Sequence, residues 1–194
     1  MSKKNGILAT LANILLKAVG SNRASRTSDP RRPVSRARGA QPASSQSTSD
    51  VEPGRRPGSE TIRIDPEWIV GLQVSYAPQR DGAPDAGEIV WTWVPYEEND
   101  GRGKDRPVLV IGRESADRVY AVRLTSKQHG TDSDYVSIGT GAWDAQGRES
   151  WVDVEQLYSV HERGLRREAA VLDRARYDGV SAVLTRRYGW TLAG

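Results

Sequence analysis

Short apolar runs separated by turn residues dominate the chain from residue 88 onward. The runs are rich in valine, isoleucine, tryptophan and tyrosine, which favour strands, and glycine-containing turns such as Gly139-Thr140-Gly141 interrupt them. They predict strands over residues 88–94, 106–112, 118–124, 134–138, 150–154 and 157–161. Repeated short strands with turns between them are typical of a small antiparallel barrel or curled sheet.

Alternation within one of these strands predicts which residues share a face. In residues 118–124, one face should be core and the other partly polar, because successive side chains of a strand point to opposite sides. The two alternating sets are Val119, Ala121 and Arg123 on one face, and Tyr120, Val122 and Leu124 on the other.

The pattern changes from strand to helix after Gly164. Residues 167–175 predict a short helix, and residues 177–188 carry Val180, Val183 and Leu184 at helical spacing before the stop at Gly189. The folded domain is therefore expected to span residues 61–194. Its predicted class is mainly β, with a C-terminal helix laid on the sheet.

Residues 1–60 differ in character from this domain. Residues 1–19 contain an apolar stripe over 7–19 that predicts an amphipathic helix, which is too short to cross a bilayer. Three roles are open for this helix: it docks on a partner protein, contacts a membrane surface or acts as an export signal. Residues 20–60 are rich in serine, proline and arginine, which predicts a disordered basic linker; attraction to nucleic acid or anionic lipid is its alternative role.

The amino-acid composition limits the kinds of site that the chain can contain. The chain has no cysteine, which excludes disulfides and thiolate zinc sites and favours a reducing, cytoplasmic compartment. The two histidines, His129 and His161, are far apart, so no metal site is expected. Residues 1–60 hold 11 Lys and Arg against 4 Asp and Glu, which leaves 17 against 21 for residues 61–194. A nucleic-acid contact in the domain would therefore need a local basic groove.

The stretch that most strongly indicates a functional site is residues 87–113. A polar loop over residues 95–105 is predicted to deliver Arg106 to the start of a buried strand, which suits recognition of a phosphate. An ion pair of Arg106 with Asp105 or Glu88 is the structural alternative. The same loop carries acidic residues that would repel a phosphate backbone unless they point away or pair with basic neighbours: Glu97, Glu98 and Asp100.

Four segments in order, GEIVW, GKDRPVLVIGR, AVRLTSK and SWVDVEQLYSV, followed by the terminal helix, resemble the MazF/PemK family of toxins from toxin-antitoxin pairs. The resemblance covers residues 85–189. It implies a small SH3-like barrel with a C-terminal helix, usually a homodimer, that is neutralised by a cognate antitoxin. It further implies an endoribonuclease that inhibits growth by cutting single-stranded mRNA without a metal or other cofactor, leaving a 2′,3′-cyclic phosphate and a 5′-hydroxyl.

The resemblance also assigns residues. The arginine of the family's RP strand falls on Arg106, and the threonine of its TS motif falls on Thr125. A guanidinium suits stabilisation of an oxyanion, and a hydroxyl can donate to a phosphoryl oxygen. Residues expected to contact substrate are Arg102, Lys104, Ser126 and Lys127.

Two further side chains are weaker candidates. His129 could transfer a proton, because an imidazole titrates near neutral pH, although a loop histidine is commonly a bystander. Trp143 lies in a predicted loop and could be an exposed platform for an unpaired base. Trp91 and Trp93 are expected in packing or at a dimer interface, with stacking on an unpaired base as the alternative. Trp151 and Trp190 are expected in packing, and His161 is expected to be structural. The functional alternatives are a non-enzymatic inhibitor of a protein target, similar to CcdB toxins, or a degenerate barrel that only binds; the N-terminal helix would contact a membrane or a partner protein.

Overall fold

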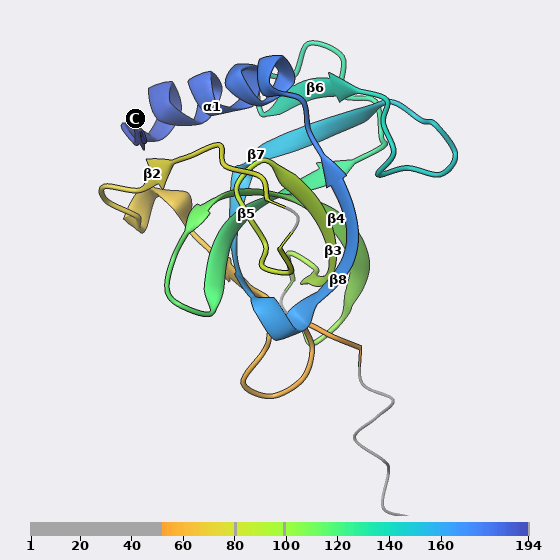
Figure 1. Cartoon of the computed structure of the whole chain (residues 1–194). Helices are drawn as coiled ribbons and strands as arrows, with labels where there is room; N and C mark the ends of the chain where they lie inside the picture. Colours follow the sequence, from red (N-terminus) through yellow and green to blue (C-terminus); the bar gives the residue numbers. More distant parts are fainter. Residues whose placement is uncertain (1–51, 80, 99, 194) are drawn as a thin grey trace, which may run out of the picture. The chain divides into compact units, whose positions relative to one another are not determined.

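In the described part of the chain, the apolar runs from residue 88 onward form an antiparallel sheet of seven strands together with β1 (Figure 1). Along the sheet the strand order is β1-β7-β5-β4-β3-β8, and β6 pairs with β7. The strands are β1 (Ile62–Ile64), β3 (Glu88–Pro95), β4 (Gly103–Arg113), β5 (Arg118–Thr125), β6 (Tyr135–Gly139), β7 (Ser150–His161) and β8 (Leu165–Val171). Among the described residues the end strands β1 and β8 do not pair, so the sheet is curled and not closed. The predicted class, mainly β with a C-terminal helix, is confirmed in this open form.

The structure is a computed structural model that describes residues 52–79, 81–98 and 100–193, with backbone only at 167–169. The predicted helix in residues 1–19 and most of the predicted linker lie outside the described residues. The end of that linker, residues 52–60, is described and consists mainly of turns and bends. Gly54, with φ 82°, packs against the Gly164 carbonyl and accepts a hydrogen bond from the Thr61 N–H at 2.8 Å. Gly54 thus contacts the domain expected over residues 61–194.

Both faces of the sheet are buried, which alternation did not predict. One face packs under the C-terminal helix and contains Leu109, Ile111, Val122 and Leu124. The other face holds a second apolar cluster made by Val90, Val94, Val108, Val110, Val119, Ala121, Tyr158 and Val160. The partly polar face of β5 is therefore also a core face, and Arg123 sits at its end.

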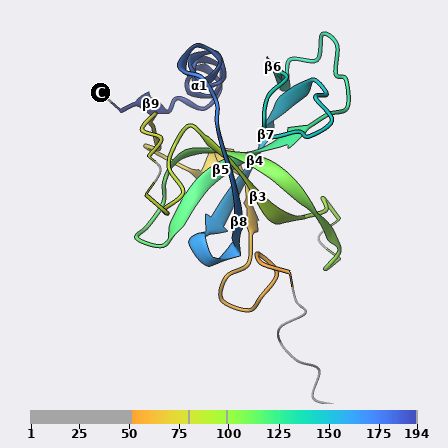
Figure 2. The same ribbon diagram turned by 45° about the vertical axis from the view of Figure 1, so that its right-hand side comes forward.

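The helix α1 (Arg174–Tyr188) covers one end of the sheet and is seen nearly end-on in Figure 2. Asp173 caps its N-terminus by accepting a hydrogen bond from the Arg176 N–H, and Gly189 ends it in the left-handed conformation at φ 69°. Its residues Tyr177, Val180 and Leu184 are buried against the sheet. The predicted helix over 177–188 is confirmed.

Two predicted elements are wrong. Residues 167–175 were expected to be a short helix, but residues 165–171 form β8, which pairs with β3 and brings Ala170 opposite Ile89. Pairing with an edge of the sheet satisfies the backbone there, and this outweighs a weak local helix preference. The two strands predicted over 150–154 and 157–161 are one continuous strand, β7, which pairs with β6 at its start and with β1 at its end.

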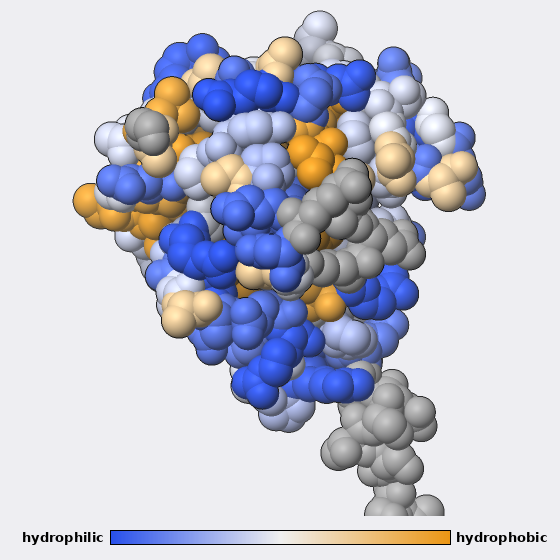
Figure 3. Space-filling model, viewed as in Figure 1, coloured by the Kyte–Doolittle hydropathy of each residue, from blue (hydrophilic) through white to orange (hydrophobic). Residues whose placement is uncertain are grey.

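Short elements outside the main sheet surround it. A 3-10 helix η2 (Pro66–Trp68) precedes β2 (Gln73–Val74), which pairs in parallel with β9 (Thr191–Leu192), and η3 (Glu162–Gly164) joins β7 to β8. The surface is largely hydrophilic in Figure 3; apolar atoms on its left lie over the segment leading into β2, where Val70 is 95% exposed. No helix among the described residues is long and apolar enough to span a membrane.

Candidate functional site

Arg106 lies inside β4 and not at its entrance. The strand starts at Gly103, and Arg106 pairs with Thr92 of β3, so the expected junction between loop and strand is three residues earlier than predicted. On its other side β4 pairs with β5, with Val108 opposite Arg123. Beyond this pair, Arg106 and Thr125 both line one cavity. Two residues far apart in the chain thus come to one place.

A cavity of about 500 Å³ opens at this place. Basic side chains outnumber acidic ones in its lining, with Lys104, Arg106, Arg123, Lys127 and Arg148 against Asp105 and Asp144. Both carboxylates already have arginine partners, since Asp105 bonds Arg166 and Asp144 bonds Arg148. Its remaining lining residues are Trp91, Pro107, Leu124, Thr125, Ser126, His129, Tyr135, Trp143 and Ser150. The cavity is therefore suited to an anionic ligand.

Arg123 is anchored in the wall of this cavity by a buried carboxylate. Its Nη2 donates to Oδ2 of Asp153 at 2.5 Å, and the Asp153 side chain is 1% exposed. Burial acts to lower the pKa of Arg123, but Tyr158 and Asp153 together raise it above its usual value. The ion pair therefore keeps Arg123 charged and in one orientation.

Arg106 is held differently. It is half-buried, and its Nε has no hydrogen-bond partner among the described residues. Burial and then the neighbouring charge of Arg123 lower the pKa of Arg106. An anion placed between the two guanidinium groups would favour the charged form of Arg106 and so counteract this lowering of its pKa.

Thr125 ends β5 and starts the turn that leads away from it. Its hydroxyl oxygen accepts a hydrogen bond from the Lys127 backbone N–H at 3.1 Å, which uses a lone pair and leaves the hydroxyl proton available. Ser126 and Lys127 follow in the turn and are exposed at the cavity. The TS motif is thus presented to the cavity by a turn that its own threonine stabilises.

Most of the residues expected at the site meet at this cavity, and one does not. Arg106, Thr125, His129, Lys104, Ser126, Lys127 and Trp143 all line it. Arg102 does not; it forms an exposed ion pair with Asp100 at 2.6 Å in the β3–β4 connection.

The expectation that Trp143 is exposed is also wrong. Its side chain is 6% exposed, its ring lies over Gly141, and its Nε1 donates to Ser150 Oγ at 3.0 Å. Trp143 is part of the core cluster beneath α1 and reaches the cavity only at its wall. A buried indole with its N–H already bonded offers no free face for a base.

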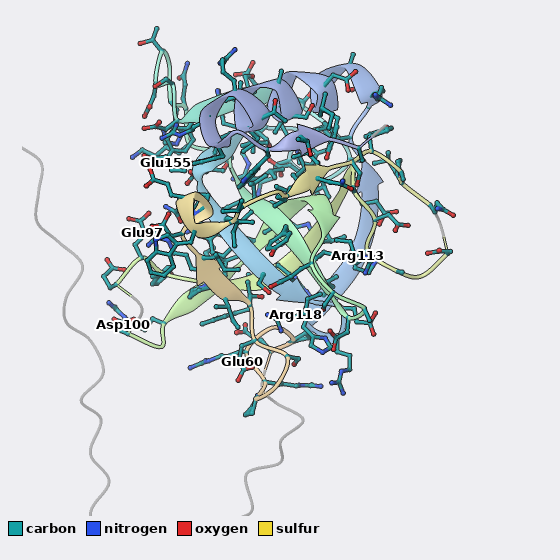
Figure 4. All side chains as sticks on the ribbon, turned by 90° about the vertical axis from the view of Figure 1, so that its left-hand side faces the viewer. Glu60, Glu97, Asp100, Arg113, Arg118 and Glu155 are labelled. Atoms are coloured by element: carbon teal, nitrogen blue, oxygen red, sulfur yellow. The ribbon has the colours of Figure 1, made fainter. Side chains whose placement is uncertain are left out.

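The acidic residues of the β3–β4 connection stay out of the cavity lining. Glu97 accepts a hydrogen bond from Gln156 at 2.7 Å and lies 3.8 Å from Arg123, and Asp100 pairs with Arg102. In Figure 4 the labelled Glu97 lies between Glu155 and Asp100, along the side of the domain. The requirement that these carboxylates pair with neighbours is met for Glu97 and Asp100.

His161 and most of the remaining tryptophans lie in the interior of the domain. His161 is buried and structural, as expected: its Nδ1 accepts from the Arg163 N–H at 3.1 Å, at the start of η3. Trp93, Trp151 and Trp190 are buried, in agreement with packing roles. Trp91 lines the cavity and has a buried Nε1 without a partner among the described residues.

Sequence reasoning missed Arg123, Tyr135 and Arg148 as cavity residues. Arg123 could have been found, because it lies two residues before Thr125 in a strand and so must share its face. Tyr135 and Arg148 come from β6 and from the turn before β7, and only the pairing of β6 with β7 brings them to the cavity.

Fold and site together define a small antiparallel β-sheet domain, covered by a C-terminal helix, with a cationic cavity at the ends of two neighbouring strands. The chain belongs to the family of PemK-like, MazF-like toxins of type II toxin-antitoxin systems, whose family model matches residues 85–187. The family resemblance of the motifs is thereby confirmed. No curated protein sequence matches the chain.

Solved structures similar to this chain include MazF from Deinococcus radiodurans. In complex with MazE that protein is 23% identical over 55% of this chain and 96% of its own, with a TM-score of 0.43. The structure of MazF from the same organism is 21% identical over 55% and 97%, with a TM-score of 0.44. An endoribonuclease from Mycobacterial species, in complex with its cognate antitoxin, is 19% identical over 55% and 96%, with a TM-score of 0.42.

Proposed function

We propose that this protein is a toxin-type endoribonuclease that cleaves single-stranded RNA by attack of a 2′-hydroxyl on the adjacent phosphate. The observation that carries the proposal is the placement of Arg106 and Thr125 at one cavity whose charged lining is mainly cationic. Membership of the toxin family supports the same conclusion.

The chemistry needs no protein nucleophile. The 2′-oxygen forms a bond to phosphorus while the bond to the 5′-oxygen breaks; the 2′-hydroxyl loses its proton and the leaving 5′-oxygen gains one. The products are a 2′,3′-cyclic phosphate and a 5′-hydroxyl. The protein has to hold the phosphate and stabilise the extra negative charge on its oxygens.

Arg106 and Thr125 suit these two tasks. Arg106 supplies a fixed positive charge beside the phosphoryl oxygens, since a guanidinium stays protonated even when burial lowers its pKa. The Thr125 hydroxyl, whose oxygen accepts from Lys127, donates its proton to a phosphoryl oxygen. Arg123, anchored by Asp153, adds a second cation, and Lys104 and Lys127 contact flanking phosphates.

We also propose two protein partners, because the family belongs to type II toxin-antitoxin systems. One is a cognate antitoxin that neutralises this chain. The other is a second copy of the chain in a homodimer. Contact of residues 1–19 with a membrane or a partner protein stays a prediction, since these residues lie outside the described part of the chain.

The test is incubation of the full-length protein with single-stranded RNA in EDTA, with the product ends identified by mass spectrometry. Wild type should leave cyclic phosphate and 5′-hydroxyl ends, and Arg106→Gln should cut about a hundred to a thousand times more slowly. Arg186→Gln, an exposed arginine of α1 away from the cavity lining, is the matched control and should cut at the wild-type rate. Undiminished cleavage by Arg106→Gln would refute the assignment, and a wild type that never cuts would favour inhibition of a protein target.

A further inference from the structure

The cavity holds a second structural feature beside its cations. We propose that the stacked rings of His129 and Tyr135 form a platform for the nucleobase next to the scissile phosphate, and that His129 acts there by stacking and not by proton transfer. The inference rests on the proposed function, because it names how the same cavity recognises its RNA.

The two rings are arranged as a flat stack. Their centroids are 3.3 Å apart and their planes are inclined by 11°, and both side chains line the cavity while remaining partly exposed. Burial and the nearby Asp153 raise the pKa of Tyr135, so its ring is neutral. Flat aromatic faces at a cavity wall are what unpaired bases stack on, whatever their sequence.

The backbone sets the platform beside the cations. Tyr135 pairs with Asp153 across β6 and β7, and Asp153 is the residue that anchors Arg123. His129 follows Thr125 by four residues, in the connection between β5 and β6. A nucleotide places a base and a phosphate at opposite sides of one ribose. The cavity offers an aromatic wall and a cationic wall to match them.

The other aromatic residues of the cavity are less suitable. Trp143 is buried with its N–H bonded to Ser150, so it presents no free face. Trp91 lies in β3, an inner strand of the sheet, and its indole Nε1 is buried. The stacked pair, in contrast, rises from the connection between β5 and β6 and from the edge strand β6.

Binding to single-stranded DNA tests the platform separately from cleavage, since DNA has no 2′-hydroxyl and stays intact. Fluorescence anisotropy would compare an ordinary oligonucleotide with an abasic one of equal length and charge. The full-length wild type should bind the base-bearing strand at least about fivefold more tightly. His129→Ala should lose most of that ratio, whereas His129→Phe should keep it, and abasic binding should be unchanged in both. Trp68→Ala, an aromatic residue 79% exposed outside the cavity lining, is the control and should keep the wild-type ratio.

Three results would overturn the proposal. They are a ratio near one in wild type, a full ratio in His129→Ala, or an equal loss in His129→Phe and His129→Ala. If Trp91→Leu loses the preference for the base-bearing strand and His129→Ala keeps it, the base stacks on Trp91. Failure of the endoribonuclease proposal is seen separately, as absence of RNA cleavage by wild type, while the base-to-abasic ratio is still measured.

Discussion

Arg123 in β5 and Asp153 in β7 form a buried ion pair at 2.5 Å, in the wall of the cavity that Arg106 and Thr125 line. The carboxylate holds Arg123 in one orientation beside Arg106, and both guanidinium groups line the cavity. This relationship gives the cavity an oriented pair of cations with a single buried anion behind it.

The first prediction concerns the contribution of Arg123 to phosphate binding. Removing one phosphate contact from a protein bound to a single strand reduces the slope of log affinity against log salt by about 0.7. The double variant Arg123→Gln with Asp153→Asn should show that reduction, measured by anisotropy with single-stranded DNA at several salt concentrations. Arg186→Gln should retain the wild-type slope. An unchanged slope in the double variant would mean that Arg123 only supports the wall.

The double variant is needed because each single change breaks a buried pair. Arg123→Gln alone leaves the Asp153 carboxylate, 1% exposed, without its cation, and should lower the free energy of unfolding by about 3 kcal/mol. Urea unfolding at an unchanged m-value checks the single variant, and the double variant should recover part of the loss.

The second prediction separates the hydroxyl of Thr125 from its bulk. Thr125→Val keeps the shape but removes the donor, and should lower kcat/KM for RNA about a hundredfold. Thr125→Ser keeps the hydroxyl that accepts from the Lys127 N–H and should recover most of the rate. Equal rates in the two variants would contradict the proposed role. A melting curve of each variant controls for the altered turn.

The third prediction concerns Gly103, the first residue of β4. A Cβ at this position would overlap the Trp93 ring and lie 2.5 Å from the Val94 carbonyl oxygen, so Gly103→Ala should destabilise the fold by about 1–3 kcal/mol. Because β4 carries Lys104 and Arg106, cleavage should fall as well. Gly179→Ala is the matched control: α1 leaves open space there, and alanine should stabilise the helix by about 0.5–1 kcal/mol. Urea midpoints measure both changes in stability. A change in the same direction for Gly103→Ala and Gly179→Ala would disprove the packing argument.

The fourth prediction concerns alkaline pH. Burial raises the pKa of Tyr158 from 10.0 to about 12, and a nearby Arg123 opposes that shift. The folded state holds this proton more tightly than the unfolded state, so the stabilisation is fully present below pH 10 and is lost as the pH rises from 10 to 12. The loss from this residue should be about 2–3 kcal/mol.

Tyr158→Phe isolates that contribution. The variant removes the titrating hydroxyl and its hydrogen bond to Gln156, so it should be less stable near neutral pH and should lose less stability between pH 10 and 12. Urea unfolding at a series of pH values compares the two proteins. Parallel pH profiles would show that Tyr158 does not titrate differently in the folded state. Burial also raises the pKa of Tyr177, so some loss should persist in the variant.

Several elements were predictable because local signals and long-range packing agree. The strands around residues 88–94 and 118–124 have apolar β-formers, and the helix over 177–188 has its stripe of Val180 and Leu184 with Gly189 as the stop. Arg106 and Thr125 followed from the family motifs. Their meeting at one cavity agrees with that assignment.

The sequence alone determined the class, the family and seven of the residues at the cavity, because composition, alternation and motif order are local properties. Only the tertiary structure decided that residues 165–171 join β3 as a strand, since an open sheet edge competed with a weak helix preference. It also buried Trp143, removed Arg102 from the cavity, and brought Arg123, Asp153, Tyr135 and His129 together. The physical reason is register: which strand pairs with which, and at what offset, decides which distant side chains share a face, and no local pattern encodes that offset.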